Sequence, residues 1–236
     1  MVWGLDIVGP LPRSVGGYLF LFVAIDKFTK WPEVQPVRSI TAQATVSFIQ
    51  GIVNHFSVPN RIITDNGCQF TSHSFLEYCD ELGTKVCFAS VAHPRSNGQV
   101  ERINAEVLKG LKTQAFNHFK TGGMGWIEEL PAVLWSLWTT PNRAAQEIPF
   151  SLVYRAEAVL PTELKFGSPR IHAYDEEAQQ ERRVDDIGFL EEVRCRAIVQ
   201  SACYQQGLCR YHRRQVRPKT PRYVTSSSVG FNLARG

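Results

Sequence analysis

Residues 2–8 have the sequence Val2-Trp3-Gly4-Leu5-Asp6-Ile7-Val8, in which a single aspartate interrupts an apolar run. A second apolar run, Arg61-Ile62-Ile63-Thr64, ends at Asp65 just before the turn pair Asn66-Gly67. Short runs rich in β-branched residues and bounded by turn signals predict strands. Asp6 and Asp65 are therefore expected on, or at the end of, strands, a setting that an ordinary surface carboxylate does not need.

A third acid stands in an equally specific setting. Glu101 opens the amphipathic stretch 101–111, directly after the polar loop 93–99. Positions 66 to 100 place 35 residues between Asp65 and Glu101. Two carboxylates on strands and one on a helix can converge at the edge of a sheet.

The N-terminal half predicts a mixed sheet. Residues 2–8, 18–25 and about 33–37 predict an antiparallel meander of three strands. Thr41 is expected to cap a helix that ends before Val58-Pro59, and a right-handed crossover leads to the strand 61–64. A helix from Ser72 or Ser74 to Leu82-Gly83 and a strand at 85–89 follow.

This order, three antiparallel strands followed by two parallel strands separated by helices, is that of an RNase H-like α/β fold, and the acid positions favour it over other α/β sheets. Helices are expected at 100–119, 126–138 and 149–154 to cover one flank. We predict a core over 1–165, a helical linker or extension over 166–216 and a disordered tail over 217–236.

Composition limits the classes of protein. The chain of 236 residues is 44% hydrophobic and 20% charged, as expected of a globular domain with appendages. The longest apolar run, at 18–25, is too short to cross a bilayer, so an intracellular protein with no membrane partner is expected. The six cysteines lack paired C-x-x-C spacing, which argues against a zinc finger and favours small buried residues.

The net charge of +4 is unevenly distributed. Residues 193–236 contain nine basic and no acidic residues, so residues 1–192 carry a net charge of −5. A basic C-terminal segment on a near-neutral body predicts an anionic polymer as partner.

The three acids and the sequence motifs around them resemble the catalytic core of retroviral-type integrases, the Asp, Asp-35-Glu polynucleotidyl transferases. The resemblance is closest to plant gypsy-type LTR retrotransposon integrases. The resemblance covers about residues 2–218. The sequence motifs on which the resemblance rests are Trp3 to Pro10, Ile63 to Phe70, His93 to Arg102 and Pro149 to Tyr154.

The resemblance implies an enzyme that trims the ends of the element's DNA and joins the recessed 3′ hydroxyls to target DNA, in the nucleus and as a homo-oligomer. It implies that Asp6, Asp65 and Glu101 are the catalytic residues and bind two Mg²⁺ ions, with Mn²⁺ as a substitute. Hard divalent cations prefer carboxylate oxygens, and a pair of them stabilises both the attacking and the leaving oxygen in phosphoryl transfer. Singly, each acid could equally be a turn former, a helix-dipole residue or a hydrogen-bonded strand acid.

Further residues are candidates for DNA contact. In the resemblance, Arg95 and Asn97 lie near DNA ends, Gly98 is the hinge of a mobile active-site loop, and Asn104 positions the acid or contacts DNA. Basic side chains on the Glu101 helix and in the C-terminal cluster are expected at phosphates, although lysines on a helix face commonly serve solubility alone. These are Arg102, Lys109, Lys112, Arg213, Arg214 and Arg217.

Two other interpretations remain. Full-length relatives begin with a zinc-binding His-His-Cys-Cys module and end with a β-barrel or chromodomain, neither of which is expected within these residues, and Arg95 and 145–147 depart from the usual family sequence. A catalytically inactive remnant that binds DNA or a protein partner is therefore one alternative. An RNase H-type nuclease is another, but such enzymes usually carry a further active-site carboxylate that this sequence does not place.

Overall fold

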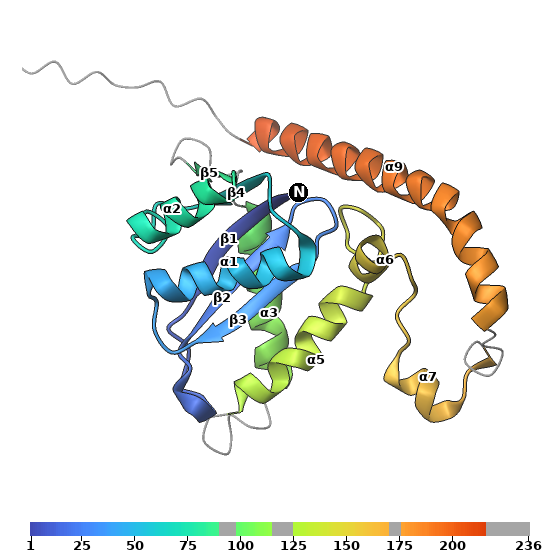
Figure 1. Ribbon diagram of the computed structural model, residues 1–236, viewed down its shortest axis with the longest axis horizontal. Helices are drawn as coiled ribbons and strands as arrows, with labels where there is room; N and C mark the ends of the chain where they lie inside the picture. Colours follow the sequence, from blue (N-terminus) through green and yellow to red (C-terminus); the bar gives the residue numbers. More distant parts are fainter. Residues whose placement is uncertain (90–97, 115–124, 170–175, 216–236) are drawn as a thin grey trace, which may run out of the picture.

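The centre of the protein is a five-stranded sheet with the strand order β3-β2-β1-β4-β5 (Figure 1). The computed structural model describes residues 1–89, 98–114, 125–169 and 176–215. β1 pairs antiparallel with β2, which pairs antiparallel with β3, whereas β1, β4 and β5 are parallel. The strands are β1 (Val2–Val8), β2 (Phe20–Asp26), β3 (Pro32–Val37), β4 (Arg61–Thr64) and β5 (Lys85–Phe88). The predicted RNase H-like arrangement is confirmed.

Helices cover both faces of the sheet, because the side chains of each strand alternate between two cores. On one face, Trp3 and Leu5 of β1 pack with residues of α1 (Ala42–Phe56) and α2 (His73–Glu81). On the other face, Val8 packs with residues of α3 (Gly98–Gln114) and α5 (Trp126–Thr139). α1 and α3 therefore lie on opposite sides of β1 (Figure 1).

Local signals in the sequence explain where most elements begin and end. The side chain of Thr41 accepts a hydrogen bond of 3.1 Å from the Ala44 backbone, which caps α1 as predicted. Gly83 has a φ of 68° just after α2, the left-handed conformation that favours glycine. β2 begins two residues later than predicted, because residues 15–17 form a 3₁₀ turn and the Tyr18 carbonyl accepts a bond from the Ser14 amide.

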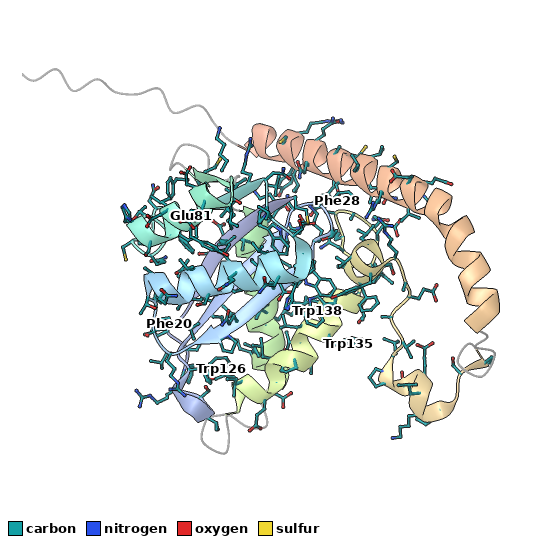
Figure 2. The ribbon with its side chains drawn as sticks, viewed as in Figure 1. Phe20, Phe28, Glu81, Trp126, Trp135 and Trp138 are labelled. Atoms are coloured by element: carbon teal, nitrogen blue, oxygen red, sulfur yellow. The ribbon has the colours of Figure 1, made fainter. Side chains whose placement is uncertain are left out.

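Aromatic packing joins the sheet to α5. The Trp31 and Trp138 rings stack with centroids 4.6 Å apart and an interplanar angle of 6°. Figure 2 shows Trp126, Trp135 and Trp138 along the same helix. The indole of Trp126 is 2% exposed and donates a hydrogen bond to the Pro12 carbonyl. Trp126 and Trp138 therefore help to pack α5 against the sheet.

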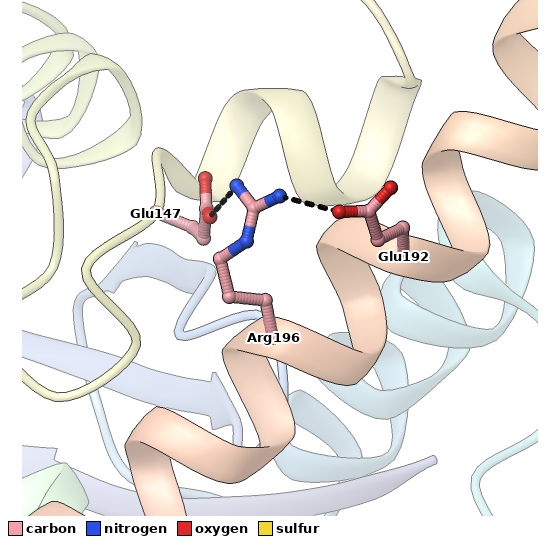
Figure 3. Close-up of polar contacts among 3 residues, drawn as sticks. All are labelled: Glu147, Glu192 and Arg196. Carbon is pink, nitrogen blue, oxygen red and sulfur yellow. Dashed lines mark hydrogen bonds and ion pairs between the residues drawn. The ribbon is translucent and has the colours of Figure 1, made fainter.

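Three helices follow α5, namely α6 (Pro149–Tyr154), α7 (Pro161–Phe166) and the long α9 (Glu176–Gln215). The sequence did not predict α7. α9 contacts the core through Ala197, which is fully buried with Ala145 and Leu152, and Phe28 of the β2–β3 turn packs against this cluster. Arg196 of α9 lies 4.0 Å from Glu147 and 3.1 Å from Glu192 (Figure 3).

Two further features of the described residues concern membrane spans and cysteines. In that part of the protein, no helix combines the length and apolarity needed to span a bilayer. All six cysteines are free, but only Cys79 is buried, and Cys68, Cys195 and Cys203 are exposed. The expectation that each cysteine is a buried apolar residue is therefore wrong for these three, which lie on a turn or on the outer surface of α9.

Candidate active site

Asp6 lies in the central strand, on the face that α3 covers. It pairs with Val23 of β2, whose side chain belongs to the same core cluster as residues of α3 and α5. On the other side, the parallel register pairs Gly4 with Ile63. Continuing that register by two residues brings Asp65 opposite Asp6, and neighbouring strands lie about 4.8 Å apart.

The carboxylate of Asp6 is held by two hydrogen bonds. Its Oδ1 accepts a bond of 2.8 Å from the Ile7 amide, and its Oδ2 accepts a bond of 2.7 Å from Asn104 Nδ2. Burial raises the pKa of Asp6 above its usual value, and the charges of Asp65 and Glu101 raise it further, while the two hydrogen bonds oppose the shift. The three carboxylates are thus close enough to share one electrostatic site.

Asp65 follows β4 in an exposed turn. Its Oδ1 accepts a hydrogen bond of 3.0 Å from the Gly67 amide, as in an Asx turn. The side chain is at the surface, whereas Thr64 before it is fully buried. The turn therefore places one oxygen of Asp65 toward its own backbone and leaves its carboxylate open to solvent.

Glu101 lies in the first turn of α3 and is exposed. Val100 beside it is fully buried and Ile103 is 3% exposed, so the apolar face of α3 fixes the direction of Glu101. Asn104 follows one turn later on the same side as Glu101 and reaches Asp6. The helix and the central strand are thereby joined next to the acids.

The chemistry of these side chains fits a hard divalent cation. Carboxylates are the donors that Mg²⁺ prefers, and the mutual repulsion of three such groups is relieved by a cation. Asn104 Oδ1 is buried beside Asp6 and has no hydrogen-bond partner, so it could accept a bond from a water molecule. In their present rotamers, however, no three His, Cys, Asp or Glu side chains within the described ranges are gathered in the arrangement of a metal site.

The candidate DNA-contact residues have different surroundings. Arg102 Nη1 donates a hydrogen bond of 3.0 Å to the Tyr204 hydroxyl of α9, and its guanidinium lies 5.7 Å from the centre of that ring. Lys109 and Lys112 are exposed and line a groove of about 720 Å³ together with Ala105 and Leu108. Gly98 is the first residue of α3.

Several of the remaining candidates fall outside the described part of the chain. Arg95, Asn97 and Arg217 lie in ranges that the structure does not describe. Arg213 and Arg214 lie in α9, but their side chains are not described. Their roles remain predictions.

One buried residue near the site, Lys30, was not predicted from the sequence. Lys30 is 4% exposed, has a φ of 65°, and donates a hydrogen bond of 3.1 Å to Gln99 Oε1 at the start of α3. Tyr204 was likewise not expected beside Glu101's neighbour Arg102. Neither contact has a local signal, because each joins residues that are 69 or 102 positions apart.

The fold and the three acids define an RNase H-like domain with carboxylates on β1, directly after β4 and in the first turn of α3. Residues 1–94 match the family model described as "Integrase core domain". Two curated relatives, the Transposon Tf2-3 and Tf2-4 polyproteins of Schizosaccharomyces pombe, are each 32% identical to this chain over 179 residues, or 75% of its length. The chain spans 13% of each polyprotein.

Solved structures show the same fold. The simian T-cell lymphotropic virus intasome matches with a TM-score of 0.55 and 21% identity, over 68% of this chain and 56% of that one. The HTLV-2 integrase catalytic core domain in complex with magnesium, in a trimeric form, matches with a TM-score of 0.53 and 21% identity, over 64% and 95%. The BIV integrase catalytic core domain matches with a TM-score of 0.51 and 19% identity, over 71% and 98%. Together, the matches support a retroviral-type integrase core.

Proposed function

We propose that this chain is the catalytic core of a retrotransposon integrase, which processes the 3′ ends of the element's DNA and joins them to target DNA. The observation that carries the proposal is the geometry of the acids, because the register of β1 and β4 brings Asp65 opposite Asp6, and Asn104, one turn after Glu101, donates a hydrogen bond to Asp6. The match to the integrase core family and the retrotransposon relatives support the same reaction class.

The proposed reaction is an in-line phosphoryl transfer. In end processing, a water oxygen forms a bond to a phosphorus atom near the DNA end, and the bond from that phosphorus to the bridging 3′ oxygen breaks. In joining, the new 3′ hydroxyl oxygen attacks a phosphorus of the target strand, and the target's own 3′ oxygen leaves with a proton. Each step breaks one P–O bond as it forms another and requires no oxidant or reductant.

The residues have distinct proposed roles. Asp6, Asp65 and Glu101 would hold two Mg²⁺ ions, which supply positive charge for the attacking and leaving oxygens. Asn104 keeps Asp6 Oδ2 directed toward α3 through its 2.7 Å hydrogen bond. The buried face of α3 holds Glu101 on the same side of the sheet as Asp6.

DNA binding and assembly are part of the proposal. Lys109 and Lys112 on the groove of α3 would neutralise phosphates without reading sequence, and a homo-oligomer would bring two DNA ends to one target in the nucleus. Two similar structures are described as an intasome and as a trimeric form, which supports an assembly of several copies.

A second candidate function is that of an inactive, DNA-binding remnant. It is favoured by the arrangement of the acids, which do not form a three-residue metal group in their present rotamers across the described residues. In that case, basic side chains would still bind DNA in a salt-dependent manner, but no cleavage would follow.

A branched DNA that mimics the joined product separates the two functions. By microscopic reversibility, resolving this DNA requires the same carboxylates as joining, without the need to bring separate ends together. With Mn²⁺, the wild-type protein should cut and rejoin the branch, and the Asp65→Asn variant should not. Equal products from both proteins, or none from either while DNA is still bound, would reject catalysis and leave the remnant.

A further inference from the structure

Both the backbone conformation and the burial of Lys30 are unusual for a lysine. It adopts a φ of 65°, the left-handed conformation that residues other than glycine rarely occupy. Its side chain is also 4% exposed, although lysine is rarely buried without a specific partner. Strain and buried charge that coincide at one residue, next to a candidate site, point to a function rather than to folding alone.

The turn around Lys30 explains how the unusual backbone is held. The Lys30 amide donates a hydrogen bond of 2.9 Å to the Asp26 carbonyl, and the Asp26 amide donates one of 3.0 Å to the Trp31 carbonyl. Asp26 Oδ2 accepts bonds from the amide and the hydroxyl of Thr29. The turn is therefore a rigid base for the Lys30 side chain.

From this base, the ammonium group reaches α3. Nζ of Lys30 donates to the Lys27 carbonyl and, at 3.1 Å, to Gln99 Oε1. Gln99 lies in the first turn of α3, two residues before Glu101. The bond thus joins the β2–β3 turn to the end of the helix that carries the third acid.

We propose that Lys30 is a positioning residue, whose hydrogen bond to Gln99 fixes the first turn of α3 and thereby holds Glu101 in place relative to Asp6. This inference rests on the proposed function for its consequence, since a displaced Glu101 matters most if the acids share a cation. The hydrogen bond between Lys30 and Gln99, here called the tether, is a property of the fold and does not depend on that function. A glycine at position 30 would suit the backbone better but could not reach Gln99.

Four variants test the tether. Lys30→Gly relieves the backbone conformation and removes the ammonium, and Gln99→Met removes the acceptor oxygen. The double variant completes a double-mutant cycle. If the two residues act through one hydrogen bond, the loss of Mn²⁺ affinity in the double variant is smaller than the product of the losses in the single variants. Gln146→Gly is the matched control, since Gln146 has a φ of 57° but lies on the loop before α6.

The first measurement is hydrogen exchange at the amides of residues 102–105, which bond to the first-turn carbonyls of α3, against that at residues 107–111. The second is the affinity for Mn²⁺ without DNA. Each single variant should speed exchange at 102–105 alone and weaken Mn²⁺ binding about tenfold, the double variant should be no worse than either, and Gln146→Gly should resemble the wild type.

Three outcomes would overturn the inference, namely normal exchange at 102–105 in Lys30→Gly, faster exchange along all of α3, or losses that multiply in the double variant. Binding of Mn²⁺ by the wild type that does not depend on Asp6 would reject the proposed function instead. In that case, the exchange measurement would still decide whether the tether exists.

Discussion

Asn104 Nδ2 donates a hydrogen bond of 2.7 Å to Asp6 Oδ2, and this bond joins α3 to the central strand of the sheet. The two residues are 98 positions apart in the sequence. Asn104 Oδ1 is buried and unpartnered, so the amide has one group committed to the acid and one free for water. Because of this bond, Asn104 directly affects the pKa and the orientation of the Asp6 carboxylate.

Replacing Asn104 by alanine should therefore change Asp6 in two measurable ways. The hydrogen bond lowers the pKa of Asp6, so its loss should raise that pKa, as measured by NMR of the carboxyl carbon. Mn²⁺ affinity should fall by about 10–100-fold, as for other residues that orient a metal ligand. Asn54→Ala on the opposite helix α1 should alter neither quantity, and an unchanged Asp6 pKa in Asn104→Ala would contradict the assignment.

Lys30 should make stability depend on pH above neutrality. Burial lowers the pKa of Lys30 from 10.5 to about 8, with the Asp26 charge opposing and the Lys27 charge adding to the shift. Between pH 8 and 10.5 the unfolded chain binds more protons at this residue, so the free energy of unfolding should rise with pH, by up to about 3 kcal/mol.

Denaturant unfolding of the wild type and of Lys30→Met at several pH values checks this rise. The difference in stability between the two proteins should change across the window, because methionine cannot titrate. A constant difference from pH 7.5 to 11 would show that folding does not lower the pKa of Lys30.

Trp31 should be one of the most sensitive core positions. It is 3% exposed and contacts the rings of Phe56, Trp138 and Phe150. Trp31→Ala should lower the free energy of unfolding by about 3–5 kcal/mol, because a large buried ring leaves a cavity. Trp135→Ala is the matched control, because Trp135 of α5 is only partly buried. It should lower the free energy of unfolding by clearly less. Equal losses of stability in the two variants would contradict the importance of the stacked Trp31 ring.

The docking of α9 should depend on its buried alanine more than on its ion pair. The Arg196 and Glu147 side chains are 46% and 23% exposed and 4.0 Å apart, so Arg196→Ala should cost at most about 1 kcal/mol. Ala197→Asp introduces a charge at a fully buried position and should release the helix.

Limited trypsin digestion measures this difference. α9 should be cut much faster in Ala197→Asp than in Arg196→Ala or the wild type, and the bond from Arg102 to Tyr204 should be lost with it. If Arg196→Ala were cut as fast as Ala197→Asp, the ion pair rather than the apolar cluster would hold the helix.

Much of the fold could be predicted because the signals are local. The strands 2–8 and 61–64 and the helix 149–154 agree with the structure residue for residue, since alternation, turn pairs and a proline at the helix start mark them. The start of β2 could not be predicted, because the turn at 15–17 depends on backbone bonds between Ser14 and Tyr18.

The candidate site could be predicted only in part. The three acids stand out in the sequence because Asp6 interrupts a predicted strand, Asp65 ends one and Glu101 opens a predicted helix. Lys30 does not stand out, because its burial and left-handed backbone follow from a partner, Gln99, that is remote in the sequence. The same holds for Tyr204, whose partner Arg102 is predicted from the sequence alone to contact DNA.

A crystal structure of the protein soaked in Mn²⁺, with anomalous scattering to locate the metal, tests the central claim most directly. We expect manganese bound between Asp6 and Asp65 and between Asp6 and Glu101, with the three carboxyl groups drawn together from their present rotamers. Manganese elsewhere on the protein, or carboxyl groups that stay more than about 8 Å apart with the metal present, would contradict the account.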